Sequence, residues 1–249
     1  MYISYCKAVL SGIEINYAFR YPDTVNYLGK YVISNIGESE NFVSLSDYEI
    51  REWEKLGSEV NGFAEYSLLH LPTSTYLLNY NRFIFHSVAF ILNKKAWLIT
   101  ALPGVGKSTQ FKNLIQLHPD EITIINGDKP ILELKDNDSF MVHPSPWNGK
   151  EQWSGTDSAP LAGIICLKQD KENTINQITP KDSVSQIFAS IHHTFENKQV
   201  IQQAGNMATK ILKSVPVWLL SNKGDLESSE LLYQTIKQWD KEHPHEVQD

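Results

Sequence analysis

Hydrophobic and polar positions divide the chain into two parts near residue 80. In residues 1–80 apolar side chains alternate with polar ones, as in Ile13 and Ile15, which follow the turn sequence Ser11-Gly12. A period of two is typical of strands with one buried face, and the Ser-Gly pair is typical of a hairpin turn. This part is therefore predicted to be a small β-rich N-terminal module, followed by a second domain over residues 81–249.

One short helix is predicted inside the module. Ser46 is followed three residues later by Glu49, which is the capping-box pattern. Leu45 and Ile50 stand at the spacing of a hydrophobic staple across the same helix start. Gly57 follows the last apolar residue and is a typical helix end, so the helix is expected to end there.

Residues 81–249 alternate between apolar runs and segments with helical spacing. The apolar runs are long enough to be buried strands, and the other segments repeat apolar residues every three or four positions. Strands interleaved with helices predict an α/β domain. The predicted strands are 83–92, 96–100, 122–125, 161–167 and 215–220. Two helices are predicted over 184–195 and 200–212, and two more are predicted to start near residues 107 and 226.

Two further segments complete this part. Residues 131–134 and 140–142 are apolar runs that flank a polar turn, which predicts a hairpin, with Asp136 and Asp138 as solvated turn residues. Residues 143–159 have little periodicity and are predicted to be a loop.

The composition of the chain limits which kinds of binding partner are expected. The chain of 249 residues has 22 Lys and Arg against 29 Asp and Glu, a net charge of −7, so a general affinity for nucleic acid is not expected. No apolar run approaches the roughly 20 residues of a membrane span, and the start lacks the pattern of a secretory signal. Cys6 and Cys166 cannot form a disulfide framework or a zinc site by themselves. We expect a cytoplasmic protein with neither a membrane nor a nucleic-acid partner.

A phosphate-binding loop is the strongest motif. The sequence Ala101-Leu102-Pro103-Gly104-Val105-Gly106-Lys107-Ser108-Thr109 fits the Walker A pattern with Ala101 in place of the first glycine. It lies between a predicted buried strand and a predicted helix, where backbone amides and the helix dipole can hold a phosphate. An ordinary glycine-containing turn is the alternative. The full motif in this context predicts that the loop binds a nucleoside triphosphate, with Lys107 on the phosphates and Ser108 on Mg²⁺.

A carboxylate follows the next predicted strand. Asp128 comes just after residues 122–125, and the chain that follows the carboxyl end of a strand in an open α/β sheet faces the ligand crevice. An aspartate there can bind Mg²⁺ or take the proton from an attacking hydroxyl.

A competing motif follows the last predicted strand. Asn222-Lys223-Gly224-Asp225 matches the NKxD pattern with which GTPases recognise guanine. The same four residues also make a good turn, in which Asp225 caps the last helix. No Asp-x-x-Gly switch motif lies between residues 109 and 221, and this weakens the GTPase hypothesis.

The motifs together resemble a known superfamily. His86-Ser87, the phosphate-binding loop, Asn126-Gly127-Asp128-Lys129 and Pro146-Trp147-Asn148-Gly149-Lys150-Glu151 occur in the order found in the HPr kinase and PEP carboxykinase superfamily. The pattern is similar above all to the HPr kinase-like proteins of modified-peptide pathways, such as lasso-peptide kinases. The resemblance covers about residues 82–240, whereas residues 1–80 match only as a short β-rich preface.

This resemblance implies a P-loop core of the HPr kinase type and a role for each matched residue. It implies that Lys107 and Ser108 hold phosphate and metal, that Asp128 is the general base, and that His86 approaches the γ-phosphate or the base. HPr kinases carry two adjacent aspartates after this strand, but here Gly127 takes the first position. This departure calls a reverse phosphorylase activity into question. The resemblance also implies that the chain could form homo-oligomers.

The loop after residue 143 supplies the remaining candidates. By resemblance, Lys150 and Glu151 contribute charge or a metal contact. Trp147 and Trp153 either cover the core or form a lid or a ledge that binds the acceptor peptide. His192-His193 is predicted to lie on a helix surface, since no third ligand stands at metal spacing.

The sequence thus predicts a kinase that uses ATP and Mg²⁺ to phosphorylate a hydroxyl, foremost a serine of a precursor peptide or small protein. A GTPase that uses Asn222 and Asp225, a nucleotide-binding regulator without catalysis, and a small-molecule kinase stay open as alternatives.

Overall fold

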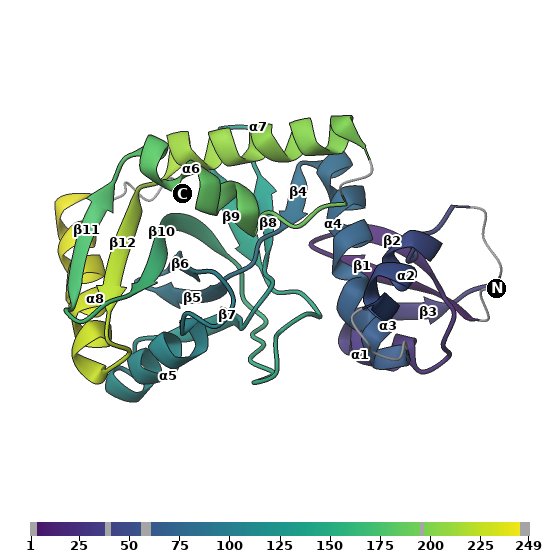
Figure 1. Cartoon of the computed structure of the whole chain (residues 1–249), viewed down its shortest axis with the longest axis horizontal. Helices are drawn as coiled ribbons and strands as arrows, with labels where there is room; N and C mark the ends of the chain where they lie inside the picture. The colour runs from purple at the N-terminus through teal and green to yellow at the C-terminus, as the bar shows by residue number, and fades with distance from the viewer. Residues whose placement is uncertain (1–3, 38–40, 56–60, 195–196, 245–249) are drawn as a thin grey trace.

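The computed structural model describes residues 4–37, 41–55, 61–194 and 197–244. Figure 1 shows the N-terminal module beside a larger part that is built around a mixed sheet. The module has a three-stranded antiparallel sheet in the order β2-β1-β3. Its strands are β1 (Ser4–Leu10), β2 (Ile13–Phe19) and β3 (Val32–Asn35). Ser11 and Gly12 have φ values of 49° and 78°, so they form the predicted hairpin turn.

The module is less strand-rich than its sequence suggests. Among its described residues it contains four α-helices: α1 (Thr24–Leu28), α2 (Asp47–Lys55), α3 (Gly62–Leu68) and α4 (His70–Leu77), with short 3₁₀ turns η1 (Gly29–Tyr31) and η2 (Leu78–Tyr80). The capping box of α2 is confirmed, because the Ser46 amide donates to the Glu49 carboxylate at 2.8 Å and the Glu49 amide donates to Ser46 Oγ at 3.2 Å. The predicted helix end at Gly57 lies outside the described residues.

Within the described residues, the larger sheet has nine strands. Seven of them follow the order β4-β8-β9-β10-β6-β5-β7, and β12 lies along β10 with β11 outside it. Strands β6, β10 and β12 are parallel to one another, while the other pairs are antiparallel. The strands are β4 (Arg82–Ile84), β5 (Val88–Leu92), β6 (Lys95–Thr100), β7 (Thr123–Asn126), β8 (Ile131–Leu134), β9 (Phe140–His143), β10 (Ala159–Gln169), β11 (Thr174–Ile178) and β12 (Val217–Asn222).

Helices cover both faces of this sheet, which confirms the α/β class. Helices α5 (Lys107–Leu117) and α8 (Leu226–Glu242) pack on one face, while α6 (Pro180–Ser190) and α7 (Lys198–Ser214) cover the other (Figure 1). Phe111 and Leu232 fill the first layer, and Ile187 and Ile211 fill the second. The prediction that one helix continues to 195 is wrong, because α6 ends at Ser190 and the chain leaves it at Ile191; Phe195 lies outside the described residues.

The two parts of the chain share a hydrophobic core. Ile84, Ile131 and Trp147 are completely or almost completely buried, and they belong to the same cluster as the apolar residues of the N-terminal module. The elements do change in character at residue 80, from helices to the large sheet. However, one buried hydrophobic cluster contains residues from both sides of that point.

Cys6 and Cys166 are buried free thiols, and burial raises their pKa to about 11 and about 12.

Among the described helices, even the longest, α7 and α8 with 17 residues each, fall short of the length and apolar character that a bilayer crossing requires.

Candidate active site

The phosphate-binding loop joins the end of β6 to the start of α5. Gly104 and Gly106 have φ values of 81° and 111°, and Gly106 is the N-cap of α5. Only glycine adopts such angles without strain, and the turn they make leads the chain directly into the N-terminus of the helix. Lys107 Nζ donates to the Ala101 carbonyl at 3.2 Å, so the ammonium lies over the loop.

Most of the predicted site residues line one cavity of about 410 Å³. From the phosphate-binding loop and α5 come Pro103, Gly104, Gly106, Lys107, Ser108 and Thr109. From the opposite side come His86, Gly127, Asp128, Gly149, Lys150 and Glu151. The structure therefore brings together the loop, the carboxylate and the distant histidine.

Two predicted residues lie elsewhere. The side chain of Val105 packs on the core beneath α5, so only its backbone can face a nucleotide. Trp147 is 3 % exposed, and its indole Nε1 donates to the Tyr66 carbonyl at 2.7 Å. Of the two roles considered for Trp147, the structure therefore favours the core over an exposed ledge. Trp153 also contributes to the core, where its ring meets Phe111 edge-on at 5.2 Å.

A tight turn after β7 sets the position of Asp128. The amides of Asp128 and Lys129 donate to Asn126 Oδ1 at 2.9 and 2.7 Å, and the Asn126 amide group donates to the Ser145 carbonyl at 3.0 Å. Asn126 is fully buried. It therefore fixes the turn that carries the carboxylate, a role that sequence reasoning missed, although an asparagine two residues before an aspartate is a known turn signal.

Two basic side chains contact the Asp128 carboxylate. His86 Nε2 lies 3.3 Å from Oδ1, and the Lys129 ammonium forms an ion pair with Oδ2. Burial alone would raise the pKa of Asp128, but the His86 hydrogen bond and the Lys129 charge outweigh it and hold the pKa below its usual value. Asp128 is therefore ionised at neutral pH. The role of Lys129 was not predicted from the sequence, because its contact depends on the shape of the turn.

Lys107, which lines the cavity, is partly desolvated. Burial lowers the pKa of Lys107 below its usual value, although the Asp128 charge favours the ammonium form. A buried ammonium with little hydration has much to gain from a bound anion. This is the environment expected for a lysine that contacts a phosphate.

The loop 147–153 lies directly on the Asp128 turn. A Cβ atom on Gly127 would come within 2.6 Å of the Asn148 carbonyl oxygen, and a Cβ atom on Gly149 lies 3.1 Å from Asp128 Cβ. The close approach leaves no room for a side chain at position 127, so glycine is required there. Lys150 at the tip is exposed and lies 3.8 Å from the Glu151 carboxylate.

His86 does not lie within a strand, which corrects the prediction of a continuous strand over 83–92. The chain leaves β4 at Ile84 and enters β5 at Val88, and in between the His86 amide donates to the Ser190 carbonyl at 2.7 Å. This break occurs because β4 pairs with β8 whereas β5 pairs with β6. The interruption turns His86 out of the ladder and towards Asp128.

Two more histidines lie behind His86. The His192 ring meets that of His86 edge-on at 5.6 Å and contacts the ring of His70, from α4, at 4.4 Å. The prediction that His192-His193 lies on a helix surface is wrong, because the pair follows the end of α6 and His193 is 3 % exposed. Sequence reasoning missed His70 entirely, since its partners are far away in the chain.

The NKxD-like segment, residues 222–225, stabilises the local structure through hydrogen bonds of its side chains. Asp225 Oδ1 accepts from the Ser228 amide at 2.9 Å and caps α8, and the Asn222 amide group donates to the Lys168 carbonyl at 3.1 Å. Asn222 is 3 % exposed. The turn-and-cap alternative is thus the one that the structure supports for these two side chains.

The donor atoms of the cavity suit Mg²⁺. Ser108, Asp128 and Glu151 offer hydroxyl and carboxylate oxygens, the hard ligands that this ion prefers. Within the described residues no three His, Cys, Asp or Glu side chains gather closely enough to hold a metal by themselves. A magnesium ion usually takes one or two carboxylates and completes its shell with phosphate oxygens and water. These residues therefore fit an ion that arrives with a nucleotide.

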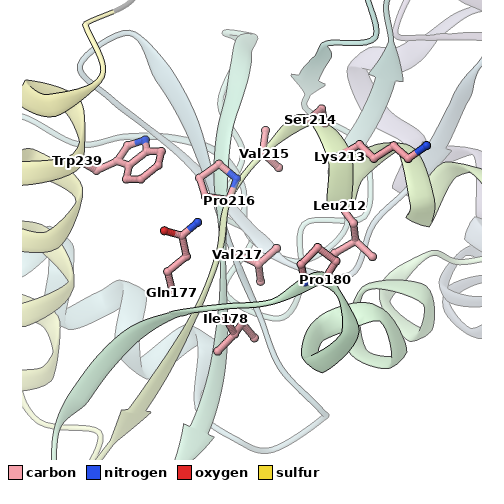
Figure 2. Close-up of a pocket in the computed structure, with 10 residues that line it drawn as sticks. All are labelled: Gln177, Ile178, Pro180, Leu212, Lys213, Ser214, Val215, Pro216, Val217 and Trp239. Carbon is pink, nitrogen blue, oxygen red and sulfur yellow. The ribbon is translucent and has the colours of Figure 1, made fainter.

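A second cavity, of about 310 Å³, lies near the start of β12 and is lined by the residues that Figure 2 draws. Ile178, Leu212, Val217 and Trp239 form much of its wall. Val217 begins β12, whereas the phosphate-binding loop follows the end of the parallel strand β6. This cavity is therefore separate from the candidate active site.

Comparisons with known proteins give a distant likeness only. No protein-family model matches the chain, and no curated protein matches it. Among solved structures, the HPr(Ser) kinase/phosphatase from Coxiella burnetii aligns at 10 % sequence identity and a TM-score of 0.39, over 64 % of this chain and 97 % of that one.

Proposed function

We propose that the protein is a kinase that uses ATP and Mg²⁺ to phosphorylate a hydroxyl group. The observation that carries the proposal is the single cavity in which Lys107 and Ser108 of the phosphate-binding loop face Asp128. A cation, a helix N-terminus and a carboxylate around one space are the parts that phosphoryl transfer needs, since catalysis consists mainly of positioning and charge neutralisation.

The phosphates of the nucleotide lie on the loop amides at the start of α5. Lys107 neutralises the β- and γ-phosphates, and the Ser108 hydroxyl, with Asp128 or Glu151, holds Mg²⁺. When bound, the ion supplies positive charge to the phosphate oxygens. Lys150, at the exposed tip of its loop, contributes a further positive charge near the cavity mouth.

Asp128 orients the acceptor. Its carboxylate accepts a hydrogen bond from the acceptor hydroxyl, whose oxygen forms a bond to the γ-phosphorus as the bond between that phosphorus and the β–γ bridging oxygen breaks. ADP leaves, and the hydroxyl proton passes to Asp128. Because the pKa of Asp128 lies below its usual value, the carboxylate is a weak base, and proton transfer is expected late in the reaction.

The acceptor that we propose is a serine of a precursor peptide or small protein. The proposal follows from the resemblance of the motifs to HPr kinase-like proteins of modified-peptide pathways. The cavity is bordered by Gly149, Lys150 and Glu151 of the 147–153 loop, which would contact such an acceptor.

The test is to replace Asp128 with asparagine and follow transfer from γ-labelled ATP to serine peptides. Asp128→Asn should lower transfer by roughly 10²- to 10⁴-fold, because an amide cannot accept the proton, while the affinity for a fluorescent ATP analogue changes by less than about threefold. Asp136→Asn, an exposed aspartate in the turn before β9, is the matched control and should retain full activity.

Other outcomes would favour the alternatives. Equal transfer by Asp128→Asn would remove the base assignment. Tight ATP binding by the wild-type protein without transfer to any hydroxyl would indicate a regulatory nucleotide-binding protein. A strong preference for GTP over ATP would indicate a GTPase.

A further inference from the structure

Helices α3 and α4 present two aromatic side chains to the candidate active site. The backbone stays helical through Leu69, with φ −60° and ψ −18°, so Tyr66 and His70 are four residues apart on one helical face. Both belong to the N-terminal module, to which the sequence assigns no chemical role. Each side chain starts a series of contacts that ends at Asp128, and the two series meet where the His70 ring lies edge-on to Trp147 at 6.3 Å.

The Tyr66 series fixes the loop that lies on Asp128. The ring of Tyr66 stacks on that of Trp147 at 6.1 Å, and its hydroxyl donates to the Pro146 carbonyl at 2.8 Å. In return, the indole of Trp147 donates to the Tyr66 carbonyl. Two hydrogen bonds and a ring stack therefore hold one short stretch of the loop.

From Trp147 the contacts reach the catalytic turn directly. The Trp147 carbonyl accepts from the Lys129 amide at 3.1 Å, and further along the loop the Trp153 carbonyl accepts from the Gly127 amide at 2.8 Å. These bonds bracket Asp128 on both sides. A shift of Trp147 would therefore displace the turn that carries the carboxylate.

The His70 series reaches Asp128 from the other side. His70 contacts His192, His192 meets His86 edge-on, and His86 contacts the Asp128 carboxylate. The His192 amide also donates to the Ile84 carbonyl at 2.9 Å, which ties this segment to the end of β4. Burial lowers the pKa of His70 to about 3, so its ring is neutral and packs as an aromatic group.

We propose that Tyr66 and His70 are positioning residues that hold the Asp128 turn and His86 from two sides, so that the N-terminal module forms part of the phosphoryl-transfer site. The inference rests on the proposed function. Its physical basis is that a catalytic carboxylate must be held within about 0.5 Å of its working position by packed and hydrogen-bonded neighbours.

The experiment compares truncating and conservative variants of the full chain. Tyr66→Leu and His70→Ala remove the rings and should lower kcat about ten- to a hundredfold, with the KM for ATP changed less than about threefold, because the phosphate-binding loop is not touched. Tyr66→Phe and His70→Phe keep the rings and should retain kcat within about fivefold.

A control separates positioning from stability. Tyr17 is fully buried in the same module, and its hydroxyl bonds with Thr73 Oγ1 at 3.0 Å. Tyr17→Phe removes this bond without touching either series of contacts, so it should lower the melting temperature and leave kcat unchanged. The proposal is overturned if Tyr66→Leu leaves kcat unchanged, or if Tyr17→Phe lowers kcat as much at an equal loss of stability.

Amide hydrogen exchange supplies a readout that needs no turnover. Tyr66→Leu and His70→Ala should speed exchange in residues 126–129 and 147–153, whereas Tyr17→Phe should not. Unchanged exchange in these segments would overturn the proposal. If the wild-type protein transfers no phosphate, the proposed function fails, and exchange would still report whether these side chains hold the turn.

Discussion

Single residues decide how closely the parts of the candidate active site approach one another. Gly127 has no room for a side chain, because the Asn148 carbonyl and Trp153 occupy the space where a Cβ atom would lie. The absence of that side chain lets the 147–153 loop rest on the turn that carries Asp128. The identity of one residue next to the carboxylate therefore controls the geometry of the site.

We predict that Gly127→Ala disrupts the site and destabilises the fold. The added methyl group would have to push away a backbone carbonyl, and such overpacking costs about 1–3 kcal/mol. Chemical denaturation should show this loss, and transfer activity should fall with it. In Gly205→Ala, the methyl group meets nothing within 4 Å on helix α7, so this control should stabilise the protein by roughly 0.5–1 kcal/mol. Equal stability of the two variants would contradict the prediction.

At this scale the sequence predicts what depends on local pattern. Lys107, Ser108 and Asp128 could be placed together, because the loop that follows one strand and the turn that follows the next strand of the sequence pattern were expected at the same side of the sheet. Lys129 and His70 could not, since their contacts depend on the shape of a turn and on packing across two parts of the chain.

Among the elements, those with local start signals were predictable. The capping box at Ser46 and the cap at Asp225 both appear in the structure, because such signals act within one helical turn. Helix α4 has no clear apolar face in its sequence, and the long run 83–92 hides the break at His86. Both features depend on tertiary packing, which the sequence pattern does not show.

We predict that Asp225→Ala affects the helix and leaves nucleotide choice unchanged. The Asp225 carboxylate caps α8 and accepts from Asn173 as well, so its loss should lower the melting temperature. The ratio of affinities for ATP and GTP, measured by competition, should stay as in the wild type. A variant that loses affinity for GTP alone would instead favour guanine recognition by this segment.

For the molecule as a whole, the main consequence of the fold is that two sequence regions share one hydrophobic cluster. Ile84, Ile131 and Trp147 are buried among residues of the N-terminal module. The sequence pattern predicts the change of elements near residue 80 but not this shared cluster. The spacing of apolar residues shows which side chains are buried but not which other residues they pack against. The module is thus part of the folded unit rather than an appendage.

We predict that acid weakens the whole fold through the buried histidines. Burial lowers the pKa of His70 to about 3 and that of His192 to about 2. The charge of Lys129 and the ring of His86 lower both pKa values further, whereas the charge of Asp128 raises them. Both rings stay neutral in the folded state, whereas in the unfolded chain they bind protons below about pH 6.5. Stability should therefore fall as pH decreases from about 6.5 towards 3, by roughly 2 kcal/mol for each histidine at pH 5.

Urea denaturation at pH 7 and pH 5 measures this effect. His70→Phe removes one of the two titrating rings, so the difference in unfolding free energy between the two pH values should shrink by about half of the histidine contribution. An unchanged difference in this variant would show that His70 is protonated in the folded state.

The buried thiols make the natural chain a convenient starting point for spectroscopy. Maleimides and similar reagents attack the thiolate, and burial both shields Cys6 and Cys166 and keeps them protonated. A cysteine placed at the exposed Lys150 would therefore carry a dye or spin label selectively, without prior removal of the native cysteines. The signal of the label at the loop tip could then be compared with and without added nucleotide.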